Sequence, residues 1–168
     1  MKKLFVVLAI LMLAVVMITG CGKSGDVKLL EKAKSYEENE QFDQAIASYQ
    51  KLIKDYSDSP NCAEAMYRAG LVYTNGMQNF ETAITTFNTV MDTFPESPFA
   101  AHSQFMIGFI YANSLSDTAN AKVAYETFLS KYPDNDLVPS VEWELKYLGK
   151  DINDIPELQQ REEKEVDK

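Results

Sequence analysis

The sequence contains few of the residues from which catalytic and metal sites are usually built. Its 168 residues include two cysteines, one histidine, one tryptophan and seven glycines. It has no glycine-rich phosphate loop, no cysteine and histidine cluster with metal-ligand spacing, and no serine in a nucleophile-elbow motif. The single histidine, His102, has no evident acid or nucleophile partner. We therefore expect a protein that is not an enzyme, with no catalytic residue, no cofactor and no metal ion.

Basic residues are also scarce. The chain carries 16 lysines and arginines against 25 aspartates and glutamates, which gives a net charge of −9. This balance argues against a nucleic-acid partner, because phosphate neutralisation needs a basic surface. No small-molecule substrate is evident either, and we expect the partners to be other proteins or extended peptide segments.

The first twenty residues have the features of a targeting segment. Lys2 and Lys3 precede an apolar run over 4–18, which is shorter than the roughly 20 residues that span a bilayer as a helix. The run ends in Ile-Thr-Gly-Cys at 18–21, which resembles the lipobox of bacterial lipoproteins, where the cysteine is acylated. The resemblance predicts a signal peptide over 1–20, lipidation of Cys21 and a linker over 21–25. An ordinary secretory signal with a chance cysteine is the alternative.

Lipidation implies a protein that is anchored to a membrane through acyl chains such as palmitate. Gly22 follows the cysteine, and no aspartate occupies that place. In lipoproteins of two-membrane bacteria this implies the outer membrane, facing the periplasm, whereas a single-membrane host implies the outer cell face. The remaining cysteine, Cys62, has no partner within the chain. Its pattern favours a small half-buried residue, with an intermolecular disulfide or a reactive thiol as alternatives.

What the sequence has in quantity is internal repetition. A small residue, an aromatic four residues later and another aromatic seven residues after that recur every 38 residues, each time before a polar stretch. These residues are Ala45, Ala83 and Ala121, then Tyr49, Phe87 and Tyr125, then Tyr56, Phe94 and Tyr132. Self-similarity at such a period is the signature of stacked helical hairpins, so the predicted fold is an all-α solenoid.

The apolar spacing predicts seven helices and no sheet. Their expected ranges are 26–39, 42–56, 61–74, 80–94, 98–113, 118–132 and 139–148. We expect Asp26 to cap the first helix, Asn75-Gly76 to end the third and Gly149 to stop the last.

The hairpins resemble tetratricopeptide repeats. That family places a small residue and an aromatic in the first helix, and an alanine and an aromatic in the second. The first-helix pairs here are Ala33 with Tyr36, Gly70 with Tyr73, and Gly108 with Tyr111. We expect the small residue to let the two helices approach closely opposite the second-helix alanine, and the aromatics to fill the wedge between hairpins.

The chain departs from the family pattern in two ways. The repeat is longer than the usual period of about 34 residues, partly through one added residue in the second and third internal turns. The expected tryptophan of the first helix is replaced by Leu29, Met66 and Gln104, and the polar Gln104 predicts weaker packing there.

The predicted domain runs over 26–149. It comprises three repeats, at about 26–60, 61–98 and 99–136, and a capping helix within 137–149. In the cap, Glu142, Glu144 and Lys146 alternate with apolar residues, so one side is expected to pack and the other to face water. The segment 150–168 is expected to be a polar, partly disordered tail.

The resemblance also implies a binding face, lined by five positions of each first helix. Carried over, these are Val27, Leu30, Lys34, Glu37 and Glu38; Glu64, Tyr67, Leu71, Thr74 and Asn75; and His102, Phe105, Phe109, Ala112 and Asn113. Seven of them are the candidate groove: Tyr67, Leu71, Asn75, His102, Phe105, Phe109 and Asn113. Tyr67, Phe105 and Trp143 recur at the 38-residue period, either as part of the core or as a binding stripe with the asparagines as backbone clamps.

A lipid-anchored stack of such hairpins resembles two groups of envelope proteins. The BamD-like lipoproteins scaffold β-barrel insertion at the outer membrane, and the lipobox matches this group. The CpoB-like periplasmic proteins coordinate envelope constriction and peptidoglycan synthesis, and they share the proline, aspartate and serine ending. The resemblance implies a membrane-anchored scaffold for protein-protein interaction, and the BamD-like group points to outer-membrane protein assembly as its role. A CpoB-like regulator or a peptidoglycan-associated binding lipoprotein is the alternative.

Overall fold

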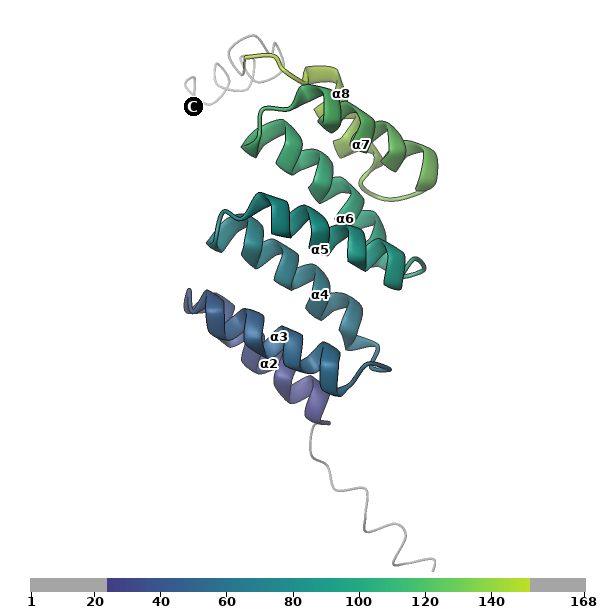
Figure 1. Cartoon of the computed structure of the whole chain (residues 1–168). Coiled ribbons are helices and arrows are strands. Elements are labelled where there is room, and N and C mark those ends of the chain that lie inside the picture. The colour runs from purple at the N-terminus through teal and green to yellow at the C-terminus, as the bar shows by residue number, and fades with distance from the viewer. Residues whose placement is uncertain (1–23, 152–168) are drawn as a thin grey trace, which may run out of the picture.

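The structure, a computed structural model, describes residues 24–151 as a stack of antiparallel helices (Figure 1). The predicted signal peptide, Cys21 and all but the first two residues of the predicted tail lie outside the described residues. The α-helices are α2 (Gly25–Glu38), α3 (Phe42–Asp55), α4 (Asn61–Leu71), α5 (Phe80–Thr93), α6 (Pro98–Phe109), α7 (Thr118–Lys131) and α8 (Val138–Tyr147). Two π-helical turns, η1 (Val72–Gly76) and η2 (Ile110–Ser114), extend α4 and α6.

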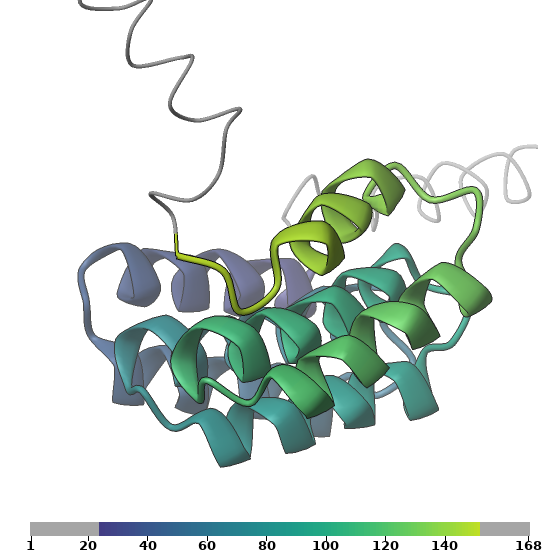
Figure 2. The same ribbon diagram turned by 90° about the horizontal axis from the view of Figure 1, so that it is seen from above.

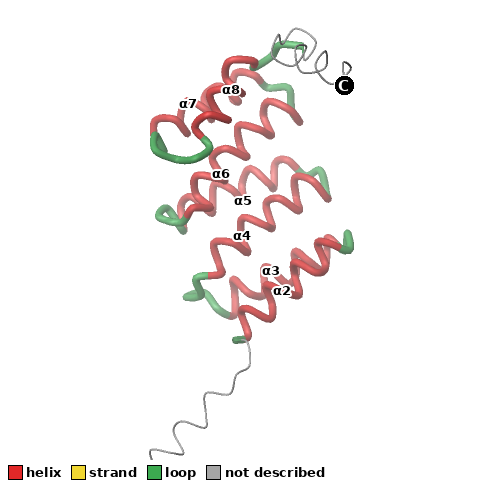
Figure 3. The backbone as a smooth tube through the Cα atoms, turned by 180° about the vertical axis from the view of Figure 1, so that it is seen from behind, coloured by secondary structure: helices red, strands yellow, loops and turns green. Residues whose placement is uncertain are grey.

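The helices alternate between two layers. The first helices of the hairpins, α2, α4, α6 and α8, form one layer, and the second helices, α3, α5 and α7, form the other (Figure 2). Short loops join them along the two edges of the stack, where the helices end (Figure 3). Within the described residues there is no strand, so the predicted all-α solenoid is confirmed.

Three clusters of buried side chains follow one another along the stack. The second-helix aromatics Tyr49, Phe87 and Tyr125 are fully buried, one in each cluster. The first-helix aromatics Tyr73 and Tyr111 are half-buried, and each packs against two successive clusters. The prediction that aromatics fill the wedge between hairpins is therefore confirmed, because these two rings join one cluster to the next.

The small residues Gly70 and Gly108 have a different neighbour from the one expected. A Cβ on Gly70 would lie 2.6 Å from the Phe87 ring, and a Cβ on Gly108 would lie 2.5 Å from the Tyr125 ring. The small residue thus makes room for the second-helix aromatic rather than for the alanine four residues before it. Glycine fits there because the facing ring is large and fully buried.

The added residue of the second and third repeats lies in the π-turns. The amide of Met77 donates to the Val72 carbonyl, and that of Leu115 donates to the Ile110 carbonyl, both over five residues. A wider turn takes up one residue without breaking the helix. The third and fifth predicted helices therefore end in this way, and Asn75-Gly76 is not the stop that we expected.

Each loop within a hairpin has one left-handed residue, and Gly76 is not among them. These residues are Glu40, Gln78 and Ser116, with φ between 51° and 57°. Gly76 is needed for a close approach instead, since a Cβ there would lie 2.6 Å from the Phe42 ring. Gly149, with φ of 73°, follows α8 as predicted.

Two polar residues behave differently from the prediction. Asp26 does not precede the first helix but lies in its first turn, where its carboxylate accepts hydrogen bonds from Ser59 Oγ at 2.5 Å and Asn61 Nδ2 at 3.0 Å. It therefore joins α2 to the start of α4. Gln104 does not weaken the third repeat, because its buried amide donates to the Ala124 carbonyl at 3.0 Å and joins α6 to α7.

The last helix, α8, packs on α7 through the buried Val141. Its exposed residues Glu142 and Lys146 stand at the register where α4 carries Met66 and Gly70, which face the second helix of their hairpin. Charged side chains at these positions fit a helix at the end of the stack, where the described residues include no second helix to cover them. The expected alternation is wrong in detail, because Trp143 is 41% exposed whereas Glu144 is half-buried.

Candidate binding face

The layer of first helices carries all seven residues of the predicted groove. We call its surface between α2 and α8 the first-helix face. Tyr67, Leu71, His102, Phe105 and Phe109 are half-buried there. Asn75 and Asn113 are exposed in the π-turns at one end of the face.

The aromatic residues of the face form two groups. Tyr67 on α4 lies 5.3 Å from the Phe99 ring and 5.9 Å from the His102 ring, both on α6, between ring centroids. Phe105 lies 6.3 Å from Phe109 on the same helix. These separations are typical of interacting aromatic pairs. The five rings of Tyr67, Phe99, His102, Phe105 and Phe109 are named the aromatic face below.

The aromatic face belongs partly to the core. Tyr67 also contacts Phe87, and Phe105 also contacts Tyr125, so each ring packs against a buried second-helix aromatic. Neither ring is fully covered, however. These two contacts fasten the helices within each hairpin, whereas the contacts of Tyr67 with Phe99 and His102 join the second hairpin to the third.

Trp143 does not extend this pattern, although it follows at the 38-residue period. Its ring contacts Tyr147 of its own helix at 5.1 Å. Within residues 24–151 no ring contact joins it to Phe105 or Phe109. Tyr67 and Phe105 share no ring contact in this range either, because Tyr67 meets α6 through Phe99 and His102.

Several other positions of the implied lining differ from the expectation. Leu30 and Thr74 are buried, and the Thr74 hydroxyl donates to the Gly70 carbonyl of its own helix. The Asn113 amide donates to the Phe109 carbonyl at 3.2 Å, so it is already engaged. Asn75 is exposed and remains available as a backbone clamp.

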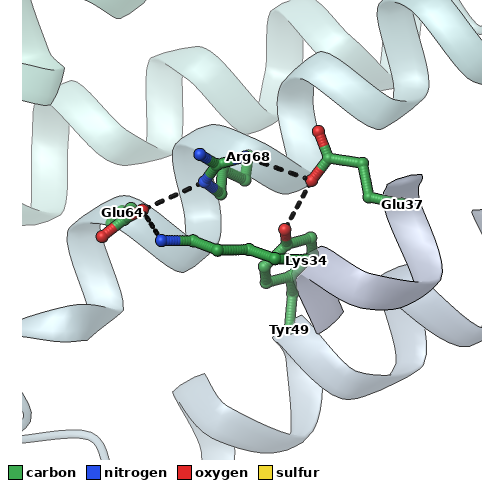
Figure 4. A network of polar contacts seen from close by, with 5 residues as sticks. All are labelled: Lys34, Glu37, Tyr49, Glu64 and Arg68. Atoms are coloured by element: carbon green, nitrogen blue, oxygen red, sulfur yellow. Dashed lines mark hydrogen bonds and ion pairs between the residues drawn. The ribbon is translucent and has the colours of Figure 1, made fainter. Parts of the chain in front are cut away.

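The α2 and α4 part of the face carries a network of charges instead of rings (Figure 4). Lys34 on α2 lies 2.5 Å from Glu64 on α4, and Arg68 lies 3.0 Å from the same carboxylate. Arg68 also reaches Glu37 on α2 at 3.4 Å, and Glu37 accepts a 2.6 Å hydrogen bond from the Tyr49 hydroxyl. Both cations are therefore paired, and the network joins the first two repeats.

The network shifts the acidity of its members. Burial raises the pKa of Glu64, but hydrogen bonds from Lys34 and Arg68 outweigh it, so the pKa of this carboxyl lies below its usual range. Burial and the bond to Glu37 hold the pKa of the Tyr49 hydroxyl far above its usual value. At neutral pH the Glu64 carboxylate is thus charged and paired with Lys34 and Arg68.

Two of these residues are missed by the sequence reasoning. Phe99 stands at the start of α6, where its repeat counterparts are Asn61 and Leu137, so no periodic signal marks it. Arg68 likewise has Met106 and Glu144 as counterparts. Features that occur in one repeat alone are invisible to an argument from periodicity.

Other groups in the described region add no further site on this face. Cys62 is buried rather than half-buried, burial raises the pKa of its thiol, and its Sγ lies 3.1 Å from the Tyr56 carbonyl. Residues 24–151 hold no cluster of three or more histidines, cysteines, aspartates and glutamates placed to bind a metal ion. None of the helices in this range is both long and apolar enough to cross a membrane.

Comparison with known proteins matches this arrangement to one family. Two tetratricopeptide-repeat family models match the sequence, one over residues 30–98 and the other over 102–135. The chain is a tetratricopeptide-repeat protein. Its family is one of protein-protein interaction scaffolds. A comparison with curated proteins finds no match.

Solved structures of tetratricopeptide-repeat domains share its fold. The Arabidopsis OM64 TPR domain is 16% identical, with a TM-score of 0.56 over 72% of this chain and 93% of that one. The TPR2AB domain of yeast Sti1 in complex with pHSP90 is 23% identical, with a TM-score of 0.60 over 74% of this chain and 49% of that one. The first TPR of Spaghetti (RPAP3), bound to the HSP90 peptide SRMEEVD, is 20% identical, with a TM-score of 0.55 over 72% and 87%.

Proposed function

We propose that this tetratricopeptide-repeat protein is a lipid-anchored scaffold of the bacterial cell envelope that holds an extended segment of another protein on its first-helix face. The observation that carries the binding proposal is the aromatic face, whose five rings are half-buried on neighbouring helices. Large rings that stay partly exposed on a rigid stack offer apolar contact at low entropic cost.

The charge of the face favours a particular kind of segment. The HSP90 peptide on the Spaghetti domain, SRMEEVD, carries three acidic residues and one basic residue. In the present chain the two cations of the charge network on this face, Lys34 and Arg68, are paired with Glu64 and Glu37. With a net charge of −9, the chain favours an apolar segment with neutral or basic flanks over an acidic one.

A binding measurement with two fluorescent heptapeptides tests this preference. One peptide is SRMEEVD, and the other contains only phenylalanine, leucine and lysine. We expect the apolar basic peptide to bind more tightly, and Phe109→Ala to weaken it by about tenfold, as truncation of an aromatic anchor does. The matched control is Val123→Ala on the exposed surface of α7, which should leave affinity unchanged. Equal binding of both peptides, or equal effects of both variants, contradicts the proposal.

The envelope location is supported by the lipobox-like sequence at 18–21 and is tested separately. Metabolic labelling with radioactive palmitate should mark the wild-type chain and not Cys21→Ala. The Cys21→Ala chain should leave the membrane fraction. Label on both chains, or on neither, would exclude lipidation at this residue.

The most detailed part of the proposal is the envelope pathway in which the protein acts. A BamD-like role in outer-membrane protein assembly fits a lipid-anchored stack of hairpins. This chain has three repeats and a cap, which is fewer repeats than BamD-like proteins usually carry. Affinity purification from detergent-solubilised membranes should then recover barrel-assembly proteins. Recovery of murein enzymes instead would favour the CpoB-like alternative, and a host with a single membrane would exclude barrel assembly.

A further inference from the structure

A cleft opens on the other side of the stack, between α3 and α5. It encloses about 430 Å³, which falls within the roughly 300–1,000 Å³ of small-molecule sites. Its lining residues are Gln50, Ile53 and Lys54 from α3, Met66, Ala69 and Tyr73 from α4 and η1, and Thr82, Thr85, Thr86 and Thr89 from α5. None of them belongs to the aromatic face.

The threonines of α5 give the cleft an apolar character despite their hydroxyls. Thr85, Thr86 and Thr89 each donate to a carbonyl of their own helix, four residues earlier, at 3.0, 2.7 and 2.9 Å. These donors are therefore satisfied within α5 and need no ligand. Together with the apolar side chains of Ile53, Met66 and Ala69, the wall is suited to hydrocarbon.

The residues that line the cleft differ from those at the equivalent place in the next pair of hairpins. At the equivalent place in the next pair, Ala69 is replaced by Ile107, which is 6% exposed, and Met66 by Gln104, which bonds to the Ala124 carbonyl. A larger side chain and a hydrogen bond thus occupy the space that stays open between α3 and α5. The cleft between α3 and α5 is thus open where Ala69 stands in place of the larger Ile107.

The charge at the rim also differs between the two places. Lys54 is the only charged residue that lines the cleft, it is exposed, and within the described part of the chain it makes no ion pair. Its counterpart in the next pair of hairpins is Asp92. A cation at the mouth of an apolar cleft complements a ligand with an apolar body and one anionic group.

We propose that this cleft binds a small amphiphile of the fatty-acid class, with its hydrocarbon chain against Met66 and Ala69 and its carboxylate at Lys54. This site lies apart from the first-helix face, so it neither requires nor competes with the segment proposed to bind there. Binding needs no covalent step, and the wall that it uses is already formed.

Dodecanoate is the probe for this site, and the methionine methyl groups report on it. The full chain is labelled with [¹³C-methyl]methionine and titrated below the micellar concentration. The Met66 signal should shift in a saturable way, while Met91, which lies 38 residues after Ile53 in the next pair of hairpins, should not. A Met66 signal that stays unchanged, or shifts no more than that of Met91, overturns the proposal.

Variants taken from the repeat itself sharpen the test. Ala69→Ile copies Ile107, fills the cleft and should abolish the Met66 shift, with a thermal melt to check folding. Thr85→Glu, at an exposed position, should also weaken dodecanoate and decides the question if Ala69→Ile does not fold. Unchanged affinity in a folded variant of either kind contradicts the site.

The carboxylate contact is tested by comparing dodecanoate with dodecanol. Lys54→Asp copies Asp92 and should weaken dodecanoate by about fivefold, the range of an exposed ion pair, while leaving dodecanol unaffected. An equal loss for both probes, or a loss for neither, shows that Lys54 does not bind the anionic group and overturns the assignment.

Discussion

At the scale of single residues, the second and third hairpins each depend on one close contact. Gly70 and Gly108 lie directly under fully buried aromatic rings, so their side chains must be absent. The sequence revealed that a small residue recurs, but not which neighbour requires it. Periodicity identifies positions, whereas the direction of each Cβ depends on how the two helices cross.

The first prediction concerns Gly108→Ala. In an open helix this change stabilises by about 1 kcal/mol. Here the new Cβ would lie 2.5 Å from the Tyr125 ring, which is fully buried, so we expect a loss of about 1–3 kcal/mol in the free energy of unfolding. Urea denaturation measures it. A double-mutant cycle with Tyr125→Leu should recover part of the loss, and a raised midpoint for the single variant would refute the contact.

A second prediction concerns the acid sensitivity of Asp26. Hydrogen bonds from Ser24 and Ser59 hold the pKa of this carboxyl well below its usual range. Its contribution to stability is therefore present above the unfolded pKa of about 4 and is lost as the pH falls toward the folded value. Denaturation midpoints at pH 7, 5, 4 and 3 should converge between wild type and Asp26→Asn as the pH falls. Parallel curves down to pH 3 would show that this carboxyl does not contribute.

At the scale of the elements, most helix bounds follow from the sequence because the apolar period and the short polar connections agree. The range of α5, Phe80–Thr93, differs from the expected one by a single residue. The ends of α4 and α6 could not be predicted in the same way, because an inserted residue can enlarge a loop or widen the helix. The backbone hydrogen bonds of η1 and η2 show that the helix widens.

The third prediction tests this account of the insertion. Deleting the exposed Met77 gives the second repeat the loop length of the first, in which the Gln41 amide donates to the Tyr36 carbonyl. We expect a chain that still unfolds cooperatively and in which η1 becomes ordinary α-helix, as measured by amide chemical shifts. Loss of the cooperative transition would mean that the extra residue is required by the packing.

At the scale of the whole molecule, the candidate site was only partly predictable. The resemblance placed all seven candidate groove residues on the first-helix layer, yet Leu30 and Thr74 of the wider lining are buried. The charge network of Lys34, Glu37, Glu64 and Arg68 depends on how α2 and α4 face each other, which one helix alone does not determine. The cleft between α3 and α5 likewise depends on residues that differ from one repeat to the next.

The same network and rings give the molecule two unlike ends of one face. Between α2 and α4 the charged side chains pair with one another. Across α4 and α6 the aromatic rings stay partly exposed. The partner segment should therefore lie across α4 and α6, beside the exposed Asn75.

Site-specific photocrosslinking in living cells tests the proposed role of this face most directly. A benzoylphenylalanine at Phe109 is compared with one at Val123, which is 61% exposed on α7 in the other layer. We predict that the Phe109 probe joins a discrete envelope protein, that Phe105→Ala abolishes the product in a chain that stays folded, and that the Val123 probe gives none. The same product from Val123, or an undiminished product with Phe105→Ala, would contradict binding at the aromatic face.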